Sequence, residues 1–253
     1  MKNAILTAKG LCKSFAQGGE QVHVLTQVEL ELFEGDFTVI MGASGSGKST
    51  LLYSLSGMDR ATAGEVIFKN RDITKLKEKE LSMLRCKDFG FIFQQMHLVS
   101  NLSLFENVVV PGYLDKERTA QQVRDYADEL LDKMGIKQVK EHLPSQVSGG
   151  EQQRCAIARA VINSPALLFA DEPTGALNRK NTTEVLNLLS GLNSAGQSIL
   201  MVTHDLRAAL RANRILYLED GSIIASLDLP PYSAEEEKSR ETQVNAWLSS
   251  LHW

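Results

Sequence analysis

Hydrophobic and polar positions along the first sixty residues follow the short periods of strands and then a helix. Between Val28 and Leu32, apolar residues alternate with glutamates, the period-2 pattern of a half-buried strand. The segment FTVIM (37–41) predicts a buried strand. A loop rich in glycine and serine then leads into a helix expected to begin near Lys48 and to end at Gly57.

The middle of the chain has a helical period instead. From about Leu104 to Ser145, apolar residues recur with the three- and four-residue spacing of one helix face. The clearest run predicts an amphipathic helix that stops at Gly135, and it comprises Val123, Tyr126, Ala127, Leu130, Leu131 and Met134. We therefore expect a helical subdomain, about 95–150, inserted into the rest of the fold.

After Gly149, strands and helices alternate again. The pattern predicts helices at 151–162 and near 181–193, strands at 166–170 and 198–202, and two short strands around Asp220-Gly221. Such alternation is typical of an α/β protein with a mainly parallel sheet and helical crossovers.

The last 24 residues are predicted to be a separate helical tail. Pro230-Pro231 ends the preceding strand, so we place the main domain at 1–229 and the tail at 230–253. The segment 233–236 (SAEE) fits a capping box at a helix start. Four apolar residues then fall on one helix face: Val244, Trp247, Leu248 and Leu251. This face must cover the domain itself, a second copy or a membrane partner, and we expect the domain itself.

Composition narrows the possible classes. The chain has 253 residues, 43% hydrophobic and 23% charged, which is ordinary globular usage. A net charge of −4 gives no broad basic surface, so we expect no nucleic-acid partner. Three scattered cysteines form neither a disulfide framework nor a metal site. No segment is apolar enough to span a bilayer and the N-terminus is not a signal peptide, so any work at a membrane would need a partner.

The strongest chemical signal is GASGSGKS at 42–49, which fits G-x-x-x-x-G-K-[ST] between a predicted strand and helix. Glycines let backbone N–H groups converge on phosphate oxygens, and the helix adds its positive end. Lys48 would reach the β- and γ-phosphates of ATP, and Ser49 would ligate Mg²⁺. The residues predicted to hold the nucleotide here are Gly42, Ala43, Ser44, Gly45, Ser46, Gly47, Lys48, Ser49 and Thr50.

The acidic partner that such a loop needs follows a second buried strand. ALLFADE (166–172) places Asp171 and Glu172 at the carboxyl end of that strand, where ligands bind in such sheets. Asp171 would hold Mg²⁺, and Glu172 would act as general base on the attacking water.

A second anion site precedes this strand. In PSQVSGGEQQRCAIARA (144–160), Ser148, Gly149, Gly150 and Glu151 open a helix. One chain needs a single γ-phosphate cradle, so a second cradle suggests a nucleotide held by another copy. At this point the chain resembles the ATP-binding cassette (ABC) ATPases, whose signature is LSGGQ; here it reads VSGGE.

This resemblance covers about 4–228 and implies further residues. It implies that Phe15 stacks on adenine, that Gln94 contacts Mg²⁺ and water, and that His204 acts as a switch near the γ-phosphate. The loop 175–178 (GALN) has Asn178 where the family usually has aspartate, which puts the coupling between two sites in doubt. The alternatives are a core aromatic for Phe15, a polar strand end for Gln94 and a structural histidine for His204.

The resemblance also implies fold, partners and function. The expected fold is a P-loop NTPase core with an N-terminal antiparallel β subdomain and an inserted helical subdomain. The expected protein is an ATP- and Mg²⁺-dependent ATPase that dimerises on ATP and drives a separate permease at the cytoplasmic face of the membrane. Segments such as GMDRATAGEV and DEPTGALN resemble the branch with macrolide exporters, lipoprotein-release ATPases and peptide-antibiotic resistance transporters, the last being favoured. The alternative is an ATPase that signals through a membrane partner without transport.

Overall fold

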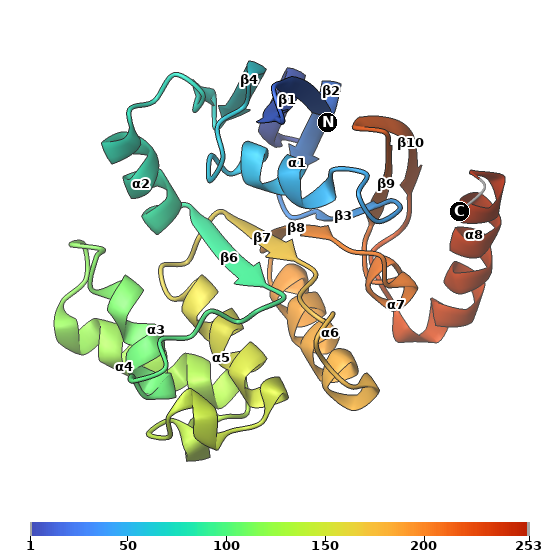
Figure 1. The fold of residues 1–253 in the computed structure, drawn as a ribbon. Helices are drawn as coiled ribbons and strands as arrows, with labels where there is room; N and C mark the ends of the chain where they lie inside the picture. Colours follow the sequence, from blue (N-terminus) through green and yellow to red (C-terminus); the bar gives the residue numbers. More distant parts are fainter. Residues whose placement is uncertain (1, 252–253) are drawn as a thin grey trace. The chain divides into compact units, whose positions relative to one another are not determined.

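The computed structural model describes residues 2–251, which form two compact units (Figure 1). Unit 1 comprises 1–81 and 193–253, and unit 2 comprises 82–192. The domain boundaries expected from the sequence differ from this division, and they stay a prediction.

An antiparallel sheet occupies the N-terminal part of unit 1. Its strand order is β2-β1-β4-β5, with β1 at Ala4–Gln17, β2 at Glu20–Phe33, β4 at Ala63–Phe68 and β5 at Arg71–Asp72. Thr7 pairs with Glu31 and Ala8 with Leu30, so the small and apolar residues share the inner face and the polar ones the outer face. The predicted N-terminal antiparallel subdomain is confirmed.

The second sheet of unit 1 is mixed. Strand β3 (Phe37–Met41) lies parallel between β8 (Ser198–Val202) and β9 (Arg214–Glu219). Every residue of β3 and β8 is buried, as expected of parallel strands covered on both faces. Strand β10 (Ser222–Asp228) pairs antiparallel with β9 through the turn at Asp220-Gly221. Helices α1 (Lys48–Leu55) and α7 (Leu206–Ala209) follow β3 and β8.

Unit 2 holds two parallel strands and most of the helices. Strands β6 (Phe89–Phe93) and β7 (Leu167–Asp171) pair directly, and helices α3 (Leu104–Gly112), α4 (Ala120–Lys133) and α5 (Gly149–Val161) lie between them in sequence. Helix α2 (Glu78–Lys87) leads into this unit, and α6 (Arg179–Ser194) leads out of it. Two short 3₁₀ turns occupy Lys137–Val139 and Pro144–Gln146.

The amphipathic helix predicted in this region is α4. Its predicted face is buried, except that Tyr126 is only half-buried, and Gly135 ends it with a φ of +67° that glycine adopts readily. The side chains of Thr119 and Gln122 form a capping box at its start, and Ser103 and Glu106 form another before α3.

The C-terminal tail forms helix α8 (Glu237–Ser250), preceded by a 3₁₀ turn at Ala234–Glu236. The predicted capping box is wrong, because the Ser233 hydroxyl accepts from the N–H of Glu235 and stabilises the 3₁₀ turn instead. The predicted apolar face is correct: Val244 and Leu248 are buried, and Trp247 meets Tyr217 of β9 edge to face at 6.4 Å. The helix therefore packs on unit 1 (Figure 1), as expected.

Within residues 2–251, no helix combines the length and the apolar character that crossing a membrane requires.

The packing of α8 can be tested at Leu248, whose side chain is 1% exposed. Leu248→Ala should lower the free energy of unfolding by about 2–5 kcal/mol, because it removes buried methyl groups and leaves a cavity. Urea unfolding followed by circular dichroism measures this change. The neighbouring exposed Ser249→Ala is the matched control and should change little; equal midpoints for both variants would contradict the packing.

Candidate functional site

The phosphate-binding loop predicted at 42–49 joins β3 to α1 in unit 1. Gly42, Gly45 and Gly47 have φ values of +155°, +82° and +100°, which other residues rarely adopt. A Cβ on Gly42 would lie 2.2 Å from the carbonyl oxygen of Leu218, and one on Gly47 would lie 3.0 Å from that of Val24. The glycines therefore let the loop run close to neighbouring backbone while it curves.

The Lys48 side chain turns back over the loop. Its ammonium donates to the carbonyl oxygens of Gly42 and Ala43, each at 2.8 Å, and the residue is 9% exposed. Ser49 and Thr50 are half-buried in the first turn of α1. One cation thus sits among the backbone groups of the loop, where phosphate oxygens would need it.

His204 lies at the same sheet edge as this loop. It follows β8, which pairs parallel with β3 so that Val202 faces Ile40, and the N–H of Thr203 donates to the Ile40 carbonyl at 3.1 Å. The next residue, Asp205, caps α7 by accepting from the N–H of Arg207. Unit 1 therefore brings the predicted switch histidine beside the start of the predicted phosphate loop.

Phe15 lies on β1 near the β1–β2 turn and is 43% exposed, so it is not a core aromatic. The Lys13 ammonium lies 4.7 Å from its ring centroid, and Lys13 pairs with Asp59 at 2.5 Å. The ring is held in place by this cation–π contact. Stacking of adenine on Phe15 stays a prediction.

In unit 2, the predicted acidic pair and the predicted glutamine share one strand edge. Phe93 of β6 faces Asp171 of β7, so Gln94 and Glu172 both come directly after the paired ends. Glu172 has a φ of +45°, an unusual backbone conformation for a glutamate. Backbone strain of this kind persists only where the surrounding structure maintains it, and it is found most often at functional sites.

Gln94 packs against the loop that follows the acidic pair. A Cβ on Gly175 would lie 2.8 Å from the Gln94 amide nitrogen, so glycine leaves room for this side chain. The sequence interpretation missed Gln153 of α5, which is fully buried and donates to the carbonyl oxygens of Phe93 (3.2 Å) and Pro173 (2.8 Å). Gln153 therefore ties the end of β6 to the loop after β7, and no periodicity in the sequence marks it.

The predicted signature segment opens helix α5. The Glu151 carboxylate accepts from the N–H and hydroxyl of Ser148 at 2.8 and 2.7 Å, and the Ser148 hydroxyl accepts from the N–H of Glu151. These hydrogen bonds hold the pKa of Glu151 below its usual value. The glutamate that departs from LSGGQ thus completes a capping box and remains an anion at neutral pH.

The start of α6 lies against the same segment. A Cβ on Gly150 would lie 2.5 Å from the Asn181 side chain, and the Asn178 side chain accepts from the Asn181 N–H at 3.0 Å. Asn178 therefore acts as an N-terminal cap, a role that asparagine and aspartate share. The starts of α5 and α6 meet within unit 2.

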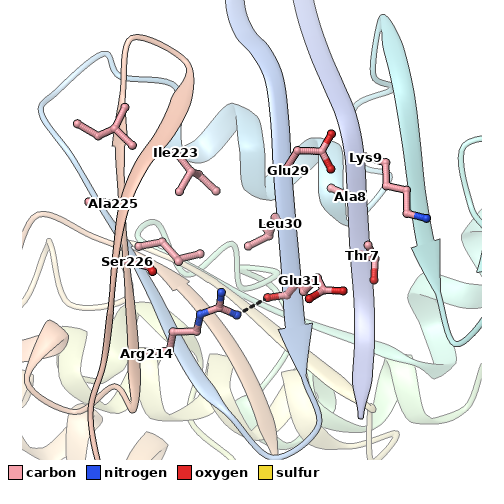
Figure 2. A pocket seen from close by; sticks show the side chains of 12 residues that line it. Thr7, Ala8, Lys9, Glu29, Leu30, Glu31, Arg214, Ile223, Ala225 and Ser226 are labelled. Atoms are coloured by element: carbon pink, nitrogen blue, oxygen red, sulfur yellow. Dashed lines mark hydrogen bonds between the residues drawn. The ribbon is translucent and has the colours of Figure 1, made fainter. Parts of the chain in front are cut away.

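A separate hollow of about 510 Å³ opens in unit 1 between β2 and β10 (Figure 2). At one end of the hollow, the Arg214 guanidinium donates to the carbonyl oxygen of Glu31 at 2.8 Å. Near its other end, the N–H of Thr26 donates to the carbonyl oxygen of Gly221 at 2.9 Å. None of the predicted nucleotide-binding residues lines this hollow, so it is distinct from the candidate site.

Each unit offers oxygen donors that suit Mg²⁺. Ser49 of unit 1 offers a hydroxyl oxygen, and Gln94 and Asp171 of unit 2 offer an amide and a carboxylate oxygen, each a hard ligand of the kind that Mg²⁺ prefers. Within residues 2–251, no cluster of three or more His, Cys, Asp or Glu side chains could hold a metal ion. Within unit 2, Gln94 and Asp171 at the paired strand ends offer the kind of oxygen ligands that suit a Mg²⁺ that is bound mainly by phosphates and water.

The fold and the loop define a P-loop NTPase. The family model "ABC transporter" matches residues 25–175. A solved relative, the dimeric ATP-binding cassette MJ0796 in a post-hydrolysis state bound to ADP and Pi, is 37% identical, with a TM-score of 0.83 over 90% of this chain and 100% of its own. The chain belongs to the ABC transporter family and is an ABC-type ATPase.

Two curated relatives differ in how much of their length the chain covers. "Macrolide export ATP-binding/permease protein MacB" of Pasteurella multocida is 39% identical over the whole chain, which spans 38% of the relative. "Uncharacterized ABC transporter ATP-binding protein MJ1508" of Methanocaldococcus jannaschii is 44% identical over 87% of the chain and 98% of its own length. The chain thus spans little more than a third of the macrolide export relatives.

The capping box at α5 can be tested with Ser148→Ala. The variant should lose about 1 kcal/mol of unfolding free energy at pH 7, the usual effect of removing a serine cap. The pKa of Glu151 is lower in the folded chain than its ordinary value of 4.5. The stabilisation that the ionised Glu151 side chain contributes is therefore fully present at pH values above its ordinary pKa. It is lost as the pH falls through the lower pKa of the folded chain.

Urea unfolding of both proteins at pH 7 and at several lower pH values measures the difference. Ser148→Thr keeps the hydroxyl and serves as the control, with stability near that of the wild type. A Ser148→Ala deficit that stays constant through acid pH would show that Glu151 does not take part in the cap.

Proposed function

We propose that this chain is the ATP-binding and ATP-hydrolysing subunit of a transporter, which dimerises on ATP and drives a separate membrane permease. One observation carries the proposal. The chain has one phosphate loop, with Lys48, in unit 1, and it has one helix start capped by Ser148, the proposed second anion cradle, in unit 2. Two complete sites would then need two copies. The dimeric state of the cassette MJ0796 supports this arrangement.

In this proposal the residues of unit 1 bind the triphosphate. Backbone N–H groups of 42–49 and the Lys48 ammonium neutralise phosphate charge, and Phe15 holds adenine. Ser49, Gln94 and Asp171 would hold Mg²⁺, which would supply positive charge against the triphosphate. His204 follows β8 at the same edge and would donate a hydrogen bond to the γ-phosphate.

The residues of unit 2 would act on water and on the second nucleotide. Glu172 accepts a proton from the attacking water, and its strained backbone fixes where its carboxylate can lie. Gln94 orients that water from the neighbouring strand end. Ser148, Gly149 and Gly150 of one copy would contact the γ-phosphate bound to the phosphate loop of the other, completing each site at the dimer interface.

A groove in unit 2 is our proposed docking surface for the permease. It has a volume of about 290 Å³ between β6, α2, α3 and α5. Phe91 and Phe93 stack at 6.0 Å along it, and Arg85 and Arg159 add positive charge. An acidic and apolar segment of the permease fits this chemistry. Of the residues in the segment 94–104 that follows β6, only His97 lines this groove.

The cargo is proposed at a finer level than the family. The name of the macrolide export relatives supports an exporter of antimicrobial compounds, and we propose peptide antibiotics as the substrate class. The archaeal relative MJ1508 consists almost wholly of the matched region, which supports a permease on a separate chain. If variants that lose ATPase activity also lose resistance, transport is supported. If the cell envelope is altered but no cargo leaves the cell, the signalling alternative is favoured.

Glu172→Gln tests the catalytic assignment. It should keep ATP binding and lower turnover by about 10²–10⁴-fold, because a general base is lost. Steady-state ATPase assays and gel filtration with ATP measure turnover and the dimer fraction, which should rise. Asp220→Asn is a matched control, since Asp220 is an exposed acidic residue with the same φ of +45°. Wild-type turnover in Glu172→Gln would refute the assignment.

Arg85→Glu tests the docking groove. Charge reversal should lower recovery of the permease at least about tenfold, because like charges across an interface cost several kcal/mol. Affinity purification from native membranes, with mass spectrometry for a protein similar to the permease part of the macrolide export relatives, measures recovery. Lys79→Glu changes an exposed residue outside the groove on the same helix and should not reduce it. Equal recovery with both variants would move the docking surface elsewhere.

A further inference from the structure

Helix α8 contributes a buried arginine to unit 1. Arg240 is 4% exposed, and its guanidinium donates to the carbonyl oxygen of Pro230 at 2.8 Å and to that of Ala212. Burial lowers the pKa of this guanidinium. Burying a cation costs free energy, and apolar contacts alone would not offset that cost.

The carbonyl of Ala212 belongs to the segment that carries the candidate switch histidine. This segment, 203–213, leaves β8 at Thr203, forms α7 and enters β9 after Asn213. Its first end is fixed to β3 by the hydrogen bond from Thr203 to Ile40. Its last end is fixed by Asn213, which donates to the carbonyl of Phe37, and by Arg240 of the tail.

A second contact joins the tail to the same segment. The Arg211 guanidinium lies 4.2 Å from the ring centroid of Tyr232, and the Tyr232 hydroxyl donates to the Glu237 carboxylate at 3.1 Å. Arg240 also lies against this ring, at 5.9 Å. Two consecutive residues of the segment, Arg211 and Ala212, are therefore held by residues of the tail.

We propose that Arg240 is a positioning residue for ATP hydrolysis, which acts by holding the segment 203–213 and thereby His204. A guanidinium suits this role because its planar fork bonds two carbonyl oxygens in fixed directions. The tail is then a brace on the switch segment and not only a cover for the sheet. This inference rests on the proposed function, in which His204 contacts the γ-phosphate.

The test compares Arg240→Gln, Arg240→Lys and the matched control Lys238→Gln in the full chain. Lys238 is exposed on the same helix and loses the same charge. We expect Arg240→Gln to lower kcat about fivefold to tenfold with KM for ATP within about twofold, since small misplacements of a catalytic group alone can cost up to about 100-fold. Arg240→Lys should recover part of the loss, and Lys238→Gln should keep wild-type values.

A merely structural role gives a different result. Arg240→Gln would then have a lower melting temperature while kcat of the folded fraction stays at the wild-type value, and the inference would be overturned. If Arg240→Gln does not fold, Arg240→Lys decides: a lowered kcat at unchanged KM supports the inference, and an unchanged kcat overturns it.

The double variant Arg240→Gln/His204→Ala separates this inference from the proposed function. If Arg240 acts through His204, adding Arg240→Gln to His204→Ala should lower the residual kcat little further. An equal further loss in that background would overturn the role of Arg240 and leave that of His204 intact. Wild-type turnover in His204→Ala alone would instead refute the assignment of His204, and the inference would fail with it.

Discussion

Parallel strand pairing is the constraint on which the candidate site depends. Parallel strands end at a common edge, so β3 and β8 bring the phosphate loop and His204 together, and β6 and β7 bring Gln94 beside Asp171 and Glu172. Burial on both faces fixes these pairings, because an apolar strand such as β3 has no polar side to turn outward. For these buried strands, polar side chains of the candidate site therefore emerge at the strand ends.

The sequence was sufficient for features with a strong local signal. Strands β3 and β8 were predicted at their observed bounds, and α4 and the apolar face of α8 followed from spacing alone. The positions of Gln94, Glu172 and His204 followed from the same pattern, because residues that come just after a buried strand must lie near its end. Their roles in binding and hydrolysis remain predictions.

The residues that the sequence did not reveal share one physical property. Gln153, Arg159 and Arg240 all donate to backbone carbonyl oxygens far away in sequence. Such contacts depend on tertiary structure and leave no periodic trace, unlike an apolar face. The capping box predicted at Ser233 failed for a related reason: the same serine can stabilise a 3₁₀ turn, and local sequence does not choose between the two.

Two of the departures from the family pattern, Glu151 and Asn178, are explained by their roles as helix caps. Glu151 keeps the capping box that glutamine would also form, and Asn178 keeps the cap that aspartate would form. Geometry at the starts of α5 and α6 is thus preserved, while a carboxylate is gained at 151 and lost at 178. The helix starts meet at Gly150 and Asn181, so the exchange moves one negative charge within a single small region. The loss of a carboxylate at 178 thus offsets the negative charge that Glu151 adds beside the proposed anion cradle, so the approach of a phosphate to Ser148 is opposed by one carboxylate of the pair and not by two.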